Sequence, residues 1–144
     1  MHRTQNGESA YECKYMRGLI TAIRTLTLFP VPGRDAEKMS DSLSFFPVVG
    51  GFIGLLVAGT AWLVGGRYGW PIGAGVIGVV VSSLVTRGLH LDGLADAFDS
   101  LGGSTVVHRL EIMKDSRIGS FGVIALVSVL ALKMAAIARL AGTG

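Results

Sequence analysis

Two long uncharged stretches decide what this sequence of 144 residues can fold into. Residues 42–66 contain no charged side chain, and residues 68–86 contain none either. Each stretch reaches the roughly 17–25 residues that a transmembrane helix needs. A third, shorter run covers residues 118–132, and it extends to residue 138 if the amine of Lys133 reaches the lipid headgroups. These runs indicate a protein that crosses a lipid bilayer about three times.

The composition agrees with a membrane protein. Only 16% of the residues are charged, which is too few to cover the surface of a soluble domain of this length. We therefore predict an all-α fold, a multi-pass transmembrane helical bundle with spans at approximately 46–66, 69–88 and 118–138. Short interfacial or cytoplasmic helices are expected at residues 17–29 and 106–116, where apolar positions recur at helical spacing.

The first sixteen residues have a different character from the rest of the chain. They are polar, with no apolar stretch behind a basic start, so we expect no cleavable signal peptide. We predict a disordered tail over residues 1–16, with Met16 as an alternative to Met1 for the true start of the protein. Residues 17–144 are then expected to form a single membrane domain.

The basic residues predict an orientation in the membrane. Six Lys and Arg residues precede the first apolar run, one lies between the first and second runs, and four lie between the second and third. This alternation follows the excess of positive charge on cytoplasmic loops. We expect the N-terminus and the loop after residue 88 to face the cytoplasm. Because the basic residues are spread over membrane-flanking segments, the net charge of +3 does not indicate a nucleic-acid partner.

Small residues recur at helical spacing in the first two apolar runs. The two stripes are Gly50, Gly51, Gly54 and Ala58 in the first run, and Gly69, Gly73, Gly75 and Gly78 in the second. Such stripes permit close approach of transmembrane helices. Glycine is also simply more frequent in membrane helices than in soluble ones, and the two interpretations are equally supported by the sequence.

An acidic cluster follows the second apolar run. Asp92, Asp96 and Asp99 are spaced at i, i+4 and i+7, so on a helix they fall within a sector of about 60°. Carboxylates beside membrane-spanning sequence are costly unless a cation binds them. Hard carboxylate oxygens are the ligands that Mg²⁺ prefers, with water and substrate phosphate completing its coordination. The alternative is an acidic helix face that is simply solvated.

A second polar cluster lies at residues 109–117. Lys114 and Arg117 supply cationic donors suited to phosphate oxygens, with Asp115 between them. The alternative is ordinary pairing of charges on a helix surface. His90 is a further candidate for a base or a phosphate-binding residue, although a histidine at a membrane boundary is more often a polar interface residue. Acidic metal ligands beside cations favour transfer of a phosphate group from a nucleotide-activated substrate to a hydroxyl.

Two long motifs in the same order carry a family resemblance. They are LHLDGLAD at residues 89–96, followed by Asp99, and LEIMKDSRIG at residues 110–119. Together with LFPVP at 28–32 and FPVVG at 46–50, they resemble the adenosylcobinamide-GDP ribazoletransferase, or cobalamin synthase, family over roughly residues 17–140.

The resemblance implies a multi-pass enzyme of the bacterial inner membrane that needs Mg²⁺. Such an enzyme joins adenosylcobinamide-GDP to α-ribazole or its 5′-phosphate and releases GMP, giving adenosylcobalamin or its 5′-phosphate. It implies that Asp92, Asp96 and Asp99 hold the metal around the diphosphate, and that Lys114, Asp115 and Arg117 contribute to phosphate binding.

The sequence departs from the family pattern at its C-terminal end. Members of the family continue with further spans, whereas this chain stops soon after the third apolar run. We therefore expect a C-terminally truncated member whose neighbours in the bilayer are missing C-terminal helices or other copies in a homo-oligomer. Two functions from other classes stay open, a cation-binding fragment of a membrane transporter and a non-catalytic membrane scaffold.

Overall fold

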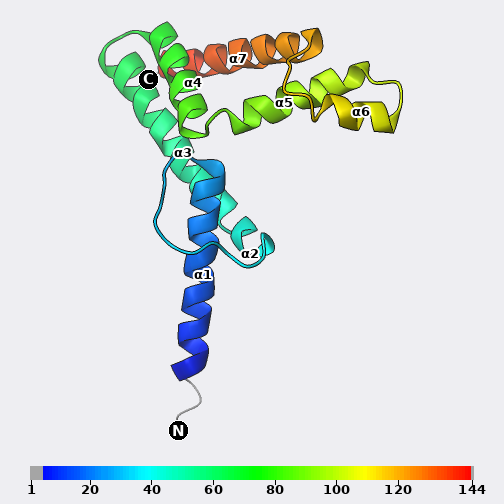
Figure 1. Cartoon of the computed structure of the whole chain (residues 1–144). Helices are drawn as coiled ribbons and strands as arrows, with labels where there is room; N and C mark the ends of the chain where they lie inside the picture. The colour runs from blue at the N-terminus through cyan, green and yellow to red at the C-terminus, as the bar shows by residue number, and fades with distance from the viewer. Residues whose placement is uncertain (1–4, 144) are drawn as a thin grey trace. The chain divides into compact units, whose positions relative to one another are not determined.

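The computed structural model describes residues 5–143, with side chains from residue 13 onward, and these residues form helices joined by loops, with no strand among them. The predicted all-α class is confirmed. Figure 1 shows the helices in chain order. By their internal contacts they divide into two compact units, with the boundary between Leu55 and Leu56 inside helix α3 (Phe46–Ala61). The single domain over residues 17–144 stays a prediction.

The first unit is built on helix α1, which runs from Gln5 to Leu26. Its apolar face buries Ala22 and Leu26 against Val49 at the start of α3. The short helix α2 (Ser40–Leu43) precedes α3. The helix predicted at 17–29 is therefore present, but it ends at Leu26 and begins well before residue 17.

The sequence predicts a disordered tail over residues 1–16, whereas in the structure residues 5–16 are helical and belong to α1. Residues 8–17 contain neither glycine nor proline, so nothing in this stretch interrupts a helix that the apolar face of residues 19–26 stabilises. Residues 1–4 of the predicted tail lie outside the described residues.

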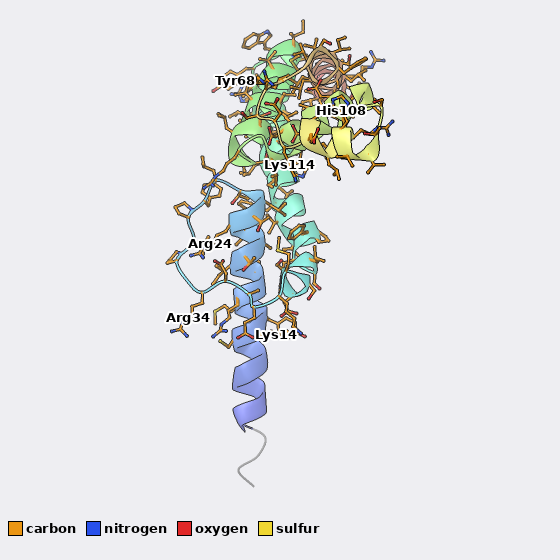
Figure 2. All side chains as sticks on the ribbon, turned by 45° about the vertical axis from the view of Figure 1, so that its right-hand side comes forward. Lys14, Arg24, Arg34, Tyr68, His108 and Lys114 are labelled. Carbon is orange, nitrogen blue, oxygen red and sulfur yellow. The ribbon has the colours of Figure 1, made fainter. Side chains whose placement is uncertain are left out.

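Hydrogen bonds from the side chain of Arg24 hold the loop between α1 and α2 against α1 (Figure 2). The Nε of Arg24 donates to the carbonyl of Val31 at 2.8 Å, and its terminal nitrogens donate to the carbonyl of Gly33 at 3.1 Å and to the carboxylate of Asp35 at 2.9 Å. The backbone N–H of Ala36 donates to Oγ1 of Thr21 at 2.8 Å. Arg24 therefore organises this loop as well as contributing to the positive charge that precedes the first apolar run.

Within residues 5–143, two helices are long and apolar enough to cross a membrane by length and composition. The first is α3 together with the π-helical segment η1 (Trp62–Arg67), which cover Phe46–Arg67. The second is helix α7, Ser120–Ala141. These two match the spans predicted at 46–66 and 118–138.

The second predicted span is shorter than expected. Helix α4 covers only Pro71–Val85, and helix α5 (Leu89–Asp99) follows it at an angle of 90°. The two helices are apolar and long enough to cross a membrane only when they are taken together, either as a broken span or as a re-entrant loop. Arg87 and Gly88 have φ angles of 54° and 71°, in the left-handed region that ends a helix. The N–H of Gly88 donates to the carbonyl of Ser83 at 2.8 Å, which closes the end of α4.

In the second unit, α4 packs against the C-terminal half of α7 through glycines. A Cβ atom on Gly75 would collide with the carbonyl oxygen of Met134, and one on Gly78 would lie 3.3 Å from Ile137. Two glycines of the second stripe, Gly75 and Gly78, therefore serve close helix packing, whereas a Cβ on Gly69 would meet no atom within 4 Å and one on Gly73 would meet the side chain of Trp70. In the first apolar run, Gly50, Gly51 and Gly54 show no such packing within the described chain. A Cβ built on any of these three glycines would meet no atom within 4 Å.

The N-terminal half of α7 packs against α5, and the two run antiparallel (Figure 1). They are connected by a 3₁₀ turn, η2 (Ser100–Gly102), and by the short helix α6 (Val106–Ile112). The helix predicted at 106–116 is thus present but ends four residues earlier. The hydroxyl of Thr105 caps α6 by accepting from the N–H of His108 at 3.2 Å.

Candidate functional site

The predicted acidic residues all lie on α5. The helix begins directly after the bend, where the carbonyl of Gly88 accepts from the N–H groups of Leu91 and Asp92 at 2.8 Å. Ala95 is only 2% exposed and turns the apolar side of α5 toward α7. Asp92 is exposed and Asp96 is half-buried.

Asp99 has a different environment from the other two carboxylates. Its Oδ2 accepts a hydrogen bond from the N–H of Gly119 and its Oδ1 accepts one from the N–H of Gly122, both at 2.8 Å. These glycines form the first turn of α7. Both oxygens of Asp99 are therefore engaged by the backbone of another helix.

Asp92 and Asp96 remain as a pair. They lie one helical turn apart on α5, and neither has a hydrogen bond or an ion pair with any other described residue. Within residues 5–143, no group of three His, Cys, Asp or Glu side chains is placed to hold a metal ion. The structure thus does not bring the three predicted metal ligands together as one group, and metal binding stays a prediction.

The remaining pair fits one kind of metal site. Mg²⁺ keeps several waters and is usually held by one or two carboxylates together with substrate phosphates, rather than by a cage made only of protein. Two adjacent carboxylates that no other described residue binds have that donor chemistry. They could hold a Mg²⁺ ion that is shared with a diphosphate.

The predicted phosphate-binding residues lie on the loop that connects α6 to α7. Lys114 is exposed on this loop (Figure 2). Arg117 donates from Nη2 and Nε to Oδ2 of Asp115, at 2.7 and 3.0 Å, and its backbone N–H donates to Oδ1 of Asp115 at 3.1 Å. The structure therefore brings Asp115 and Arg117 together as an ion pair. The loop continues into Gly119, which binds Asp99 of α5.

Arg117 shifts the acidity of its partner. Its side-chain hydrogen bonds, and then its backbone N–H, lower the pKa of Asp115, and Asp115 in turn raises the pKa of Arg117. Arg117 is exposed and Asp115 is half-buried, so solvent and salt screen the pair and it contributes little to stability at high ionic strength.

We expect the Asp115–Arg117 pair to be sensitive to acid. A carboxyl whose folded pKa is lowered stabilises its loop above the ordinary pKa of Asp, and that contribution is lost as the pH falls through the lowered folded pKa. Replacing Arg117 with Gln should return the pKa of Asp115 toward its ordinary value of 3.8. Carbon-13 NMR titration of labelled aspartate carboxyls measures this, and an unchanged pKa in Arg117→Gln would show that the pair does not form.

His90 is exposed in the first turn of α5. Residues two apart on a helix lie about 200° from each other, so His90 and Asp92 occupy opposite sides of α5. The structure does not bring His90 to the acidic pair. Its predicted role as a base or a phosphate-binding residue stays a prediction.

Three residues of this region have structural roles that sequence reasoning did not assign. Gly119 and Gly122 bind Asp99, and the Nε of Arg109 donates to the carbonyl of Gly103 at 2.9 Å, which holds the turn before α6. The available signal was two glycines, three residues apart, at the start of the third apolar run. That spacing places both on the first turn of a helix.

A cleft of about 440 Å³ lies in the first unit, whereas the residues described above belong to the second unit. Lys14, Arg17 and Lys38 line it, together with Glu37 and Asp41. Lys14 pairs with Asp41 at 3.2 Å and Arg17 with Glu37 at 3.3 Å. These pairs use both carboxylates, and Lys38 has no ion pair with another described residue.

Comparison with known proteins gives a consistent family. The family model described as cobalamin-5-phosphate synthase matches residues 18–143. The chain is 51% identical to the adenosylcobinamide-GDP ribazoletransferase of Chlorobium phaeovibrioides over 90% of this chain and 52% of that protein. It is 50% identical to the protein of the same name from Chlorobaculum tepidum, over 88% of this chain and 50% of that one.

A more distant relative has the same name. The adenosylcobinamide-GDP ribazoletransferase of Desulforamulus reducens is 43% identical over 79% of this chain and 47% of its own length. The chain spans about half the length of the curated relatives it matches. No solved structure matches it.

Proposed function

The chain belongs to the cobalamin-5-phosphate synthase family, and we propose that the whole protein joins adenosylcobinamide-GDP to α-ribazole or α-ribazole 5′-phosphate, with release of GMP. The product is adenosylcobalamin or its 5′-phosphate. The observation that carries the proposal is a pair of carboxylates on α5, Asp92 and Asp96, that have no hydrogen bond or ion pair with another described residue. Asp99 and Gly119 connect α5 to the loop that carries Lys114 and Arg117. Both parts lie inside the segment that the family model matches.

The reaction requires a hydroxyl of the ribazole to attack phosphorus. A new P–O bond forms between that hydroxyl oxygen and the phosphate attached to the corrinoid, the phosphoanhydride bond breaks, and GMP leaves with the bridging oxygen. The hydroxyl proton goes to a carboxylate oxygen of Asp92 or Asp96, which acts as a general base. A Mg²⁺ ion held by Asp92 and Asp96 would neutralise charge on the diphosphate.

The loop between α6 and α7 supplies positive charge in this proposal. Lys114 has no ion pair with another described residue, so its ammonium group is available to a phosphate oxygen. Arg117 is already held by Asp115, in a fork geometry that also suits phosphate. A bound phosphate would compete with Asp115 for Arg117.

We place the protein in the bacterial inner membrane, with its N-terminus and α5 on the cytoplasmic side. The distribution of basic residues supports this orientation, and nucleotides are present on that side. Further helices of the whole protein, or other copies of it, are the proposed neighbours in the bilayer.

Release of GMP tests the proposed function. Membranes that contain the protein in its complete natural length should release labelled GMP from adenosylcobinamide-GDP when α-ribazole and Mg²⁺ are supplied, and EDTA should stop the release. The same membranes without the protein are the control. Cation flux into vesicles without any nucleotide requirement would favour a transporter, and absence of both activities would favour a scaffold.

A further inference from the structure

Asp99 differs in role from the other two carboxylates of α5. We propose that Asp99 is a positioning residue that caps α7 and fixes α5 against it, and that it does not bind the metal. The part of this inference that concerns catalysis rests on the proposed function. The part that concerns helix capping does not.

The first argument is that the N-terminal N–H groups of α7 require hydrogen-bond acceptors from outside the helix. The first N–H groups of a helix have no partner within the helix, and the positive end of the helix dipole favours a nearby carboxylate. The N-cap position of α7 is Gly119, which has no side chain that could cap the helix. Asp99 meets this need from the neighbouring helix, because it accepts from the N–H groups of both Gly119 and Gly122 at 2.8 Å.

The second argument is that both capping positions have no room for a side chain. The three atoms closest to a Cβ built on Gly119 are all carboxylate atoms of Asp99. A Cβ on Gly122 would collide with Oδ2 of Asp99 and would lie 3.1 Å from the carbonyl oxygen of Ala95. Glycine at both positions therefore permits the carboxylate of Asp99 to reach the backbone of α7.

The third argument is distance. Asp92 and Asp99 are seven residues apart, which is about 10 Å along the axis of α5. Two oxygens that bind one Mg²⁺ at about 2.1 Å can be at most ~4 Å apart. The carboxylate of Asp99 is held on α7 by two hydrogen bonds, so it cannot also turn back toward Asp92.

The function of this arrangement is to set the position of Asp92 and Asp96. Small buried residues, Ala95 on α5 and Gly122 and Ala125 on α7, let the two helices approach closely. The hydrogen bonds from Gly119 and Gly122 to Asp99 then fix the position of α5 along the axis of α7. It also fixes the start of α7, and with it the loop that presents Lys114 and Arg117.

A double-mutant cycle tests the cap without reference to activity. Asp99→Ala and Gly119→Ala should each lower the melting temperature of the complete protein in detergent by about 4 °C. The double variant should melt no lower than Asp99→Ala alone, because the three atoms closest to a Cβ on Gly119 all belong to the side chain that Asp99→Ala removes. Gly93→Ala is the control, since a Cβ on Gly93 of α5 meets no atom within 4 Å. Additive losses in the double variant would overturn the cap.

Metal binding and kinetics separate positioning from ligation. With Mn²⁺ and GDP as probes in paramagnetic resonance, Asp99→Asn should keep the half-saturating Mn²⁺ concentration within about twofold, whereas Asp92→Asn and Asp96→Asn should raise it at least about tenfold. In GMP release, Asp99→Asn should lower kcat about tenfold with an unchanged KM for the corrinoid substrate.

Each failure has a distinct meaning. Weak Mn²⁺ binding in Asp99→Asn, equal to that of Asp92→Asn, would make Asp99 a ligand and overturn the inference. An unchanged kcat would show that the cap does not position the site, and would overturn the catalytic part. If the unmodified protein releases no GMP while the melting and Mn²⁺ results hold, the proposed function fails and the cap stands.

Discussion

Replacing Asp92 or Asp96 with Asn should reduce Mg²⁺-dependent release of GMP by at least about 100-fold, which is the typical loss when one group that stabilises transition-state charge is removed. Asn has nearly the same shape as Asp but has no negative charge to bind a divalent cation. Neither side chain has a hydrogen bond or ion pair with another described residue, so the fold should be unaffected. Labelled GMP release from membranes, with the melting temperature measured in parallel, checks both statements.

A matched control for these variants is Glu37→Gln. Glu37 is an exposed carboxylate with one exposed ion pair, to Arg17 at 3.3 Å, so the change removes the same charge far from α5 in the sequence. Its expected GMP release is that of the unmodified protein. If both Asp92→Asn and Asp96→Asn keep more than a tenth of the activity, the acidic pair does not carry the chemistry.

Replacing Gly75 with Ala should severely destabilise the second unit. The added methyl group would collide with the backbone oxygen of Met134 and lie 3.3 Å from Cβ of Ala138, so α4 and α7 would have to separate. Overpacking of this kind costs about 1–3 kcal/mol. We expect a melting temperature in detergent lower by about 5 °C or more, with less folded protein in membranes.

Gly54→Ala is the matched control for this variant. Gly54 also lies inside an apolar helix, but a Cβ there meets no atom within 4 Å. Alanine favours a helix over glycine by about 1 kcal/mol, so the melting temperature should stay the same or rise slightly. Equal losses from Gly75→Ala and Gly54→Ala would mean that the packing of α4 on α7 is not what makes Gly75 sensitive.

The sequence predicted the helical class and the long spans because their signal is local. Uncharged runs of sufficient length mark α3 with η1 and α7 directly. The bend after α4 was harder to predict, because it depends on a left-handed φ angle at Arg87, which its residue type does not favour. The sequence also did not show which glycine stripe has a partner, because that depends on the path of the chain.

The candidate site was predicted in its residues but not in its geometry. Helical spacing placed Asp92, Asp96 and Asp99 on one helix face, and the structure has all three on α5. The pattern within one helix contains no information about a neighbouring helix. It could not show that the carboxylate of Asp99 accepts hydrogen bonds from the backbone N–H groups of Gly119 and Gly122. The pairing of Asp115 with Arg117 is local in sequence, yet it depends on a turn that follows the end of α6.

The early end of α4 has a consequence for the lipid around the protein. A helix of 15 residues is about 22 Å long, whereas the hydrocarbon core of a typical bilayer is about 30 Å thick. If α4 crosses the bilayer without α5, it matches its surroundings only where the bilayer becomes thinner beside it. Such a local depression would bring headgroups and water down toward the bend, so that the carboxylates of α5 meet a hydrated surface rather than acyl chains.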